Sequence, residues 1–150
     1  MLLIYNQQQN IIMPNWCGNE IIIKGDKSSI NKLKGDLRTD KEKLEMSFQR
    51  TIPRPDKEDE DWYDWNVKNW GTKWDADGYL DENSDETLSG CFSTAWSPPC
   101  EWARQVAIKY NIEVIIKYRE PGMEFSGTIT ATKDEYLDQE DEFIASEEEW

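Results

Sequence analysis

The first half of the chain carries one strand pattern, one helix pattern and a second strand pattern. Residues 19–25 (NEIIIKG) form a short apolar run closed by a glycine, which predicts a strand. After Ser28, a candidate N-cap, apolar residues recur on one helical face at Ile30, Leu33 and Leu37. Residues 44–52 (LEMSFQRTI) alternate apolar and polar positions, so we expect a second strand that ends before Pro53.

The second half repeats this order and adds a hairpin. Residues 88–96 (LSGCFSTAW) predict a strand, and Ser97 followed by Pro98 predicts a helix start with a capping serine. The inner face of that helix comprises Ala103, Val106, Ala107 and Tyr110, and Asn111 is its expected end. Residues 112–120 and 124–132 alternate on either side of Pro121-Gly122, which predicts two strands joined by a turn.

Two segments lie outside these patterns. Residues 55–86 are acidic, rich in tryptophan and without sustained periodicity, so we expect a long insertion there. From Asp134 to Trp150 the apolar residues have helical spacing among many acids, which predicts an acidic C-terminal helix. Residues 1–12 have the character of a disordered leader, and either Met1 or Met13 fits as the start of translation.

The order of these elements favours one compact domain over residues 13–133. Two strand-helix-strand halves with helices on one face of a mainly antiparallel sheet predict an α+β fold, a ferredoxin-like sandwich. With 150 residues the chain is long enough for a single core. An exposed edge strand of such a sheet is compatible with a homodimer.

Charge narrows the choice of partners. The net charge is -14, but residues 56–86 hold 12 acids against 3 bases, and residues 134–150 hold 9 acids and no base. The rest of the chain is therefore mildly basic, at +4. The overall charge disfavours unspecific binding to nucleic acid or to an anionic membrane, but it leaves room for a small anionic ligand at a basic spot.

Composition also argues against several kinds of chemistry. The chain has no histidine, so the usual general base and the commonest zinc ligand are missing. Its three cysteines form no CxxC pair and no secretory signal or membrane-length apolar run is evident, which predicts reduced thiols in a cytoplasmic protein. Residues 75–86 (DADGYLDENSDE) place their glycine wrongly for a calcium loop. We expect no catalysis, no metal and no cofactor.

Four short blocks resemble a known family. They are MPNWCGNEIIIKG at 13–25, NWGTKWDA at 69–76, FSTAWSPP at 92–99 and YREPGMEFSG at 118–127. Together they are similar to the YubB-type ferredoxin-like proteins of phages and plasmids, over about residues 13–133. The resemblance implies the ferredoxin-like fold and a mobile-element setting, and it implies no reaction and no catalytic residues.

The tryptophans around residues 69–78 (NWGTKWDADG) admit two interpretations. In the first, Trp70, Trp74 and Trp96 fill the core and Gly71 relieves a tight turn. In the second, the same indoles form a platform on which a base stacks, while a cation meets phosphate. The candidate cations are Lys73, Arg54 and Arg119.

Two functions follow from these alternatives. The leading hypothesis is an anti-defence accessory protein that sequesters a nucleotide-like signal in a pocket lined by these tryptophans. The rival is an acidic inhibitor that mimics nucleic acid and binds a basic host defence protein through its insertion and tail. The host setting in both derives from the family resemblance alone.

Overall fold

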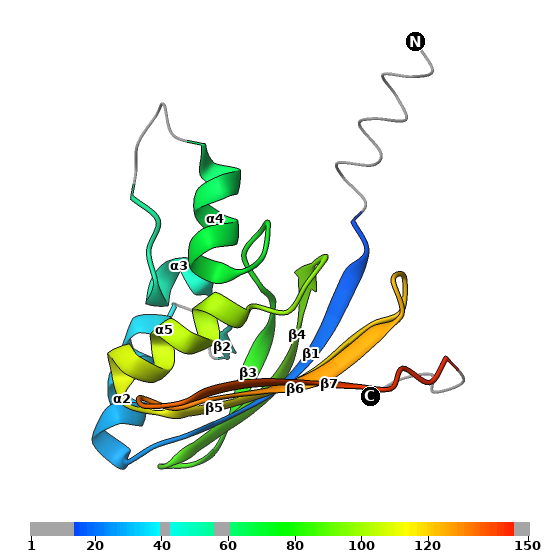
Figure 1. Cartoon of the computed structure of the whole chain (residues 1–150). Coiled ribbons are helices and arrows are strands. Elements are labelled where there is room, and N and C mark those ends of the chain that lie inside the picture. Colours follow the sequence, from blue (N-terminus) through cyan, green and yellow to red (C-terminus); the bar gives the residue numbers. More distant parts are fainter. Residues whose placement is uncertain (1–13, 40–42, 56–60, 146–150) are drawn as a thin grey trace.

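The computed structural model describes residues 14–39, 43–55 and 61–145. Within these ranges lie one sheet of seven strands and four helices, and the helices cover one face of the sheet (Figure 1). The strands are β1 (Trp16–Lys24), β2 (Leu44–Glu45), β3 (Asp77–Ser84), β4 (Thr87–Ala95), β5 (Glu113–Glu120), β6 (Phe125–Ala131) and β7 (Tyr136–Asp141). The helices are α2 (Lys27–Leu37), α3 (Phe48–Thr51), α4 (Trp62–Trp70) and α5 (Cys100–Tyr110).

The sheet is antiparallel, with the order β2-β3-β4-β1-β5-β6-β7. β1 and β3 both pair with β4, which lies between them, so they run parallel and the chain from β1 through α2 to β3 is a crossover. β4 and β5 flank β1 in the same way and are joined by α5. Two interlocked crossovers of this kind make the ferredoxin-like sandwich that the sequence predicted.

The alternation of β1 explains how the core forms. Cys17, Asn19, Ile21 and Ile23 are buried beneath the helices, while the residues between them face the other side of the sheet. Along α5 the four residues expected on its inner face are all buried, together with Trp102, which is 0 % exposed. Each of the larger aliphatic side chains among them, such as Ile21, Ile23 and Val106, contributes roughly 1.5 to 3 kcal/mol by leaving water.

The predicted hairpin and helix end are confirmed. β5 and β6 pair from Val114 with Ala131 to Glu120 with Phe125, and their alternate apolar residues are buried. Asn111 ends α5 in the left-handed conformation with φ 53°, which asparagine tolerates better than most residues.

Both predicted helix caps need correction. In α2 the N-cap is Asp26, whose Oδ1 accepts the Ser29 amide at 2.8 Å, and Ser28 lies inside the first turn. α5 begins at Cys100 after Pro99, without a side-chain cap, because the Ser97 hydroxyl instead donates to the Gly71 carbonyl at 2.7 Å. In α2 the Asp26 carboxylate takes the place expected for Ser28, and before α5 the Gly71 carbonyl occupies the hydroxyl of Ser97.

The predicted strand over residues 44–52 is wrong beyond its first two residues. Ser47 caps the short helix α3, accepting the Arg50 amide at 3.2 Å. The Asp75 carboxylate accepts the amides of Phe48 and Gln49 at 2.6 and 3.1 Å, which satisfies the first N–H groups of that helix. A side chain 27 residues away in the chain thus overrides the local alternation.

The presumed insertion, residues 55–86, contains regular structure. α4 covers its middle, and β3 pairs with β4 over nearly its whole length. The segment therefore belongs to the sandwich, because β3 is one of the strands in the crossover from β1. Residues 56–60 lie outside the described part of the chain.

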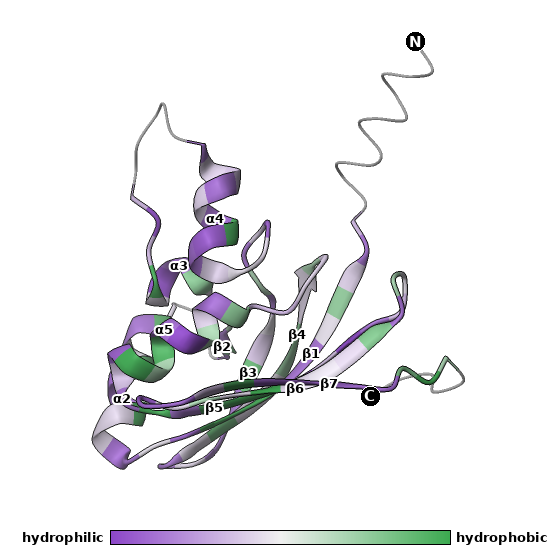
Figure 2. Cartoon of the chain, in the orientation of Figure 1, coloured by the Kyte–Doolittle hydropathy of each residue, from purple (hydrophilic) through white to green (hydrophobic). Residues whose placement is uncertain are grey.

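The predicted C-terminal helix is a strand where the structure describes it. β7 pairs with β6 from Tyr136 with Ala131 to Asp141 with Ser126. In Figure 2, β7 is drawn largely in the purple of hydrophilic residues, and residues 137–141 are exposed. The edge of β6 supplies backbone hydrogen bonds to this segment. These bonds favour a strand more strongly than the helical spacing of its apolar residues favours a helix. The predicted leader, residues 1–12, and residues 146–150 lie outside the described ranges.

Among the helices of the described residues, none has the length and apolar character needed to cross a membrane.

Candidate functional site

Several large aromatic side chains lie outside the core. Trp16, Trp62 and Tyr63 keep 47, 44 and 44 % of their surface exposed, and Trp74 is half-buried. Trp62 stacks on Tyr63 with 5.9 Å between ring centroids, and Trp16 lies 6.2 Å from Trp74. They come from α4, from the loop after it and from the beginning of β1, all at one end of the molecule (Figure 1).

Lys73 joins the two aromatic pairs. Its Nζ lies 4.9 Å from the centre of the Trp74 ring and 5.2 Å from that of Tyr63. Both distances allow cation–π attraction, which holds the ammonium between the rings. None of the ion pairs between described residues includes Lys73. We call Trp16, Trp62, Tyr63, Lys73 and Trp74 the aromatic surface.

A sharp reversal of the chain after α4 positions Lys73 and Trp74. Gly71 has φ 84°, and its amide donates to the carbonyls of Asn66 and Val67. A Cβ at Gly71 would lie 2.9 Å from the Cys100 amide nitrogen, so only glycine fits at this position. Thr72 is buried and its hydroxyl donates to the Trp74 carbonyl at 2.7 Å, which fixes the loop.

Asn66 connects two of the predicted cations. This buried residue of α4 accepts from Arg54 Nη1 at 2.9 Å and donates its Nδ2 to the Lys73 carbonyl at 2.7 Å. The structure therefore brings Arg54 and Lys73 into one hydrogen-bonded network. The Arg54 side chain is half-buried, and the bond to Asn66 limits how far its guanidinium can move.

Trp70 is a core residue, as the first interpretation of the motif predicted. Only 2 % of it is exposed, its Nε1 donates to the Ile52 carbonyl at 2.9 Å, and its ring packs on Phe48 and Trp65. The NWGTKW motif is thus divided: its first tryptophan fills the core and its second lies in the aromatic surface.

The contacts described for Trp96 and Arg119 do not include Lys73. Trp96 is 41 % exposed, with φ 74°, and its amide donates to the Asn15 carbonyl at 2.8 Å, next to Trp16 in the chain. The Arg119 guanidinium lies 4.4 Å from the centre of the Phe143 ring, and its Nη2 donates to the Ile144 carbonyl at 3.0 Å. These described partners of Arg119 are in the C-terminal segment, outside the aromatic surface.

Carboxylates border the aromatic surface on α4. Asp61 is the N-cap of the helix and Asp64 follows one turn later. A hydrogen bond to Asp61, and then the charge of that residue, raise the pKa of the Asp64 carboxyl above its ordinary value. A multiply charged anion would meet these acids close to a single lysine, so the local charge favours a ligand of low negative charge.

Sequence analysis missed four residues of this region: Trp16, Trp62, Tyr63 and Asn66. A signal existed for Trp16, because strict alternation places it on the face opposite Ile21 and Ile23 once the strand begins at residue 16. Trp62, Tyr63 and Asn66 fell in the presumed insertion. Their roles depend on the return of the chain at Gly71, which the local pattern did not reveal.

The fold and the exposed aromatic surface define a ferredoxin-like α+β domain with a candidate binding face. A family model described as the ferredoxin-like domain in Api92-like protein matches residues 69–150, so the chain belongs to this family. The crystal structure of protein Api92 from Yersinia pseudotuberculosis superimposes with a TM-score of 0.68, covering 90 % of this chain and 100 % of that one. The two sequences are 8 % identical, so the likeness shows the fold alone. No curated protein matches the sequence.

Proposed function

We propose that the protein binds a nucleotide-like ligand on the aromatic surface and acts by sequestering it, without catalysis. The observation that carries this proposal is the position of Lys73 Nζ between the Tyr63 and Trp74 rings, with Trp16 against Trp74. Aromatic rings around a cation suit a ligand that combines a planar base with phosphate. Each base stacked on an aromatic side chain contributes about 1 to 3 kcal/mol of binding free energy.

The structure changes which residues this proposal assigns to the ligand. Trp74, Lys73 and the exposed Trp16 present faces or charge at the surface, whereas Trp70 is occupied in the core. Arg54 supports Lys73 through Asn66. Trp96 borders the surface through its bond to Asn15.

The biological setting is a further part of the proposal. The YubB-type resemblance of the sequence blocks suggests a phage or plasmid accessory protein. Accessory genes of mobile elements often counter host defence, so a sequestered nucleotide would act as a defence signal in the host cytoplasm. This setting rests on the resemblance and not on any contact in the protein.

Calorimetric titration tests the binding proposal. The purified chain is titrated with mononucleotides and with cyclic dinucleotides, alongside the variants Trp74→Ala and Lys73→Gln. We expect both variants to lose affinity, Trp74→Ala by about 1 to 3 kcal/mol. The matched controls come from a second pair of a lysine and an aromatic residue, Lys43 and Tyr79. The Lys43 Nζ lies 5.7 Å from the centre of the Tyr79 ring, and Tyr79 is exposed.

In these controls, Tyr79→Ala and Lys43→Gln should bind as the wild type does. Equal losses in both pairs would indicate unspecific attraction and would overturn the assignment to the aromatic surface. Recovery of the ligand unchanged after incubation would agree with sequestration, whereas a converted ligand would identify an enzyme.

A second candidate function is an acidic surface that binds a basic protein. The observation that favours it is the exposure of four successive acidic or polar residues of β7, Asp138 to Asp141, on an edge of the sheet. These charges lie on a strand instead of the expected helix. In a mimic of nucleic acid, the row of acidic side chains along the β7 edge of the sheet would therefore take the place of the phosphates. Binding of a basic partner through this edge should weaken steeply with salt.

A further inference from the structure

Glu120 holds a carboxylate oxygen that the protein does not satisfy. The residue ends β5 and is 0 % exposed. Its Oε2 accepts the Met123 amide at 2.6 Å, while no described residue gives its Oε1 a hydrogen bond. A buried carboxylate oxygen without a donor is costly, so an orphaned one points to a donor from outside the chain.

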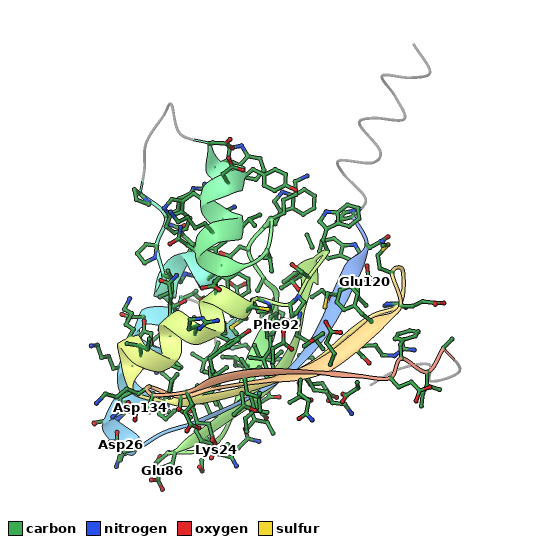
Figure 3. The ribbon with its side chains drawn as sticks, in the orientation of Figure 1. Lys24, Asp26, Glu86, Phe92, Glu120 and Asp134 are labelled. Carbon is green, nitrogen blue, oxygen red and sulfur yellow. The ribbon has the colours of Figure 1, made fainter. Side chains whose placement is uncertain are left out.

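This carboxylate lies at the end of the sheet where β1 begins (Figure 3). Gly18 pairs with Arg119, so Glu120 is one position further on, opposite Cys17. The following turn, residues 121–124, rests on Asn15, because a Cβ at Gly122 would lie 2.7 Å from the Asn15 side chain. Asn15 and Cys17 flank Trp16, so the backbone of Glu120 lies opposite the residue that follows Trp16, with its side chain on the buried side of the sheet.

The turn above Glu120 has few anchors. Its Met123 side chain is 68 % exposed, and the Met123 amide is tied to Glu120 itself. Glu124 has φ 57°, a left-handed conformation that is unfavourable for a residue with a Cβ. Because Glu120 is fully buried, a ligand can reach its carboxylate only if this turn shifts, and such a shift breaks the Glu120–Met123 hydrogen bond.

We propose that Glu120 recognises the base of the ligand and selects guanine. This inference rests on the proposed function. A carboxylate only accepts hydrogen bonds, and both its oxygens have capacity left here. Guanine presents two adjacent donors, N1–H and the 2-amino group, which match a carboxylate in two parallel bonds. Adenine and cytosine place an acceptor nitrogen beside their amino group, and that acceptor would face the carboxylate unfavourably.

Base preference provides the test. The wild type is titrated calorimetrically with GMP, with IMP, which lacks the 2-amino group, and with AMP. We expect GMP to bind at least about tenfold more tightly than IMP or AMP, since hydrogen bonds to a charged group are among the stronger ones. The variant Glu120→Gln should lose this preference, while Glu124→Gln, a change at an exposed carboxyl in the same turn, should keep it.

A thermal melt accompanies each variant. Glu120→Gln should melt no lower than the wild type, because it replaces a buried carboxylate that has one unsatisfied oxygen by a neutral amide. Equal affinity for the three nucleotides, or a guanine preference that survives in Glu120→Gln, would overturn this inference and leave the aromatic surface standing. Absence of binding by all three to the wild type, together with absence of binding by the cyclic dinucleotides, would overturn both.

Discussion

The Asn66 side chain holds the backbone of Lys73: its Nδ2 donates to the Lys73 carbonyl at 2.7 Å. Asn66 is 2 % exposed and lies on α4, whereas Lys73 lies in the loop beyond Gly71. One buried amide therefore ties the helix to the residue on which the proposed function depends. Asn66 also accepts from Arg54, so it contacts the guanidinium of one cation and the backbone of the other.

Replacing Asn66 should destabilise the fold and weaken ligand binding together. Asn66→Ala leaves the Lys73 carbonyl without this donor and Arg54 without its acceptor, so we expect a loss of about 1 to 3 kcal/mol in the free energy of unfolding. Asn66→Asp retains the acceptor for Arg54 but places a carboxylate against the Lys73 carbonyl. Urea unfolding measures the stability of both variants. An unchanged midpoint in both would contradict the role of Asn66 in holding the loop.

Trp70 and Trp74 should respond differently to truncation. Trp70→Ala removes a core ring that packs on Phe48, and we expect it to cost about 3 to 5 kcal/mol of unfolding free energy. Trp74→Ala removes a half-buried ring whose aromatic partner, Trp16, is itself exposed. It should therefore cost less than Trp70→Ala: the contribution of the smaller buried area, plus about 0.5 to 1.5 kcal/mol for the contact between the two rings. Denaturant unfolding decides, and equal large losses would place Trp74 in the core as well.

Alkaline pH should destabilise the protein through Cys17. Burial raises the pKa of this thiol from its ordinary value of 9.0 to about 12. Between these values the unfolded chain has lost the thiol proton and the folded chain keeps it, so the free energy of unfolding falls by up to about 1.4 kcal/mol per pH unit. Below pH 9 this contribution is fully present.

Urea unfolding of the wild type and of Cys17→Ala, between about pH 8 and about pH 11, tests the contribution of this thiol. The variant is less stable at the lower pH because it has lost a buried side chain, but its stability should fall less steeply as the pH rises. Cys91→Ala, at an exposed cysteine, is the control for removal of a thiol. Parallel pH profiles for the wild type and Cys17→Ala would refute the assignment to Cys17.

The pairing of β7 with β6 predicts the effect of Asp138. The Tyr118 hydroxyl donates to Asp138 Oδ1 at 2.7 Å, across β6. Asp138→Ala should therefore lower the free energy of unfolding by about 1 to 3 kcal/mol, since it leaves a largely buried hydroxyl unpaired. Tyr118→Phe combined with Asp138→Ala should cost little more than either change alone. Additive losses in the double variant would show that the two residues do not interact.

The sequence predicted those elements whose burial follows local periodicity. The hairpin of β5 and β6 and the inner face of α5 could be predicted because alternate or helically spaced apolar residues all enter one core. Residues 48–51 could not, because the Asp75 carboxylate supplies acceptors from far along the chain. The C-terminal segment could not either, because the free edge of β6 decides its conformation and only Tyr136 of its first apolar pair turns inward.

The candidate site was predictable in part for the same reason. Lys73 and Trp74 are adjacent in the sequence, so the NWGTKW motif was enough to single them out. Trp16 and Tyr63 join them only through the fold, since one begins β1 and the other lies on α4. Trp70 shares the motif but points into the core, because the helix that carries it continues to Trp70 and the chain reverses only at Gly71.

The most direct test of the proposed function is a nuclear magnetic resonance titration of the ¹⁵N-labelled chain with GMP. The eight tryptophan indole N–H signals, assigned by substitution, report separately on the surface and the core. We predict that the Trp74 and Trp16 signals shift with ligand concentration, while those of Trp70 and Trp102, whose Nε1 atoms are bonded inside the protein, stay in place. Signals of Trp74 and Trp16 that remain unchanged at saturating GMP would contradict nucleotide binding at the aromatic surface.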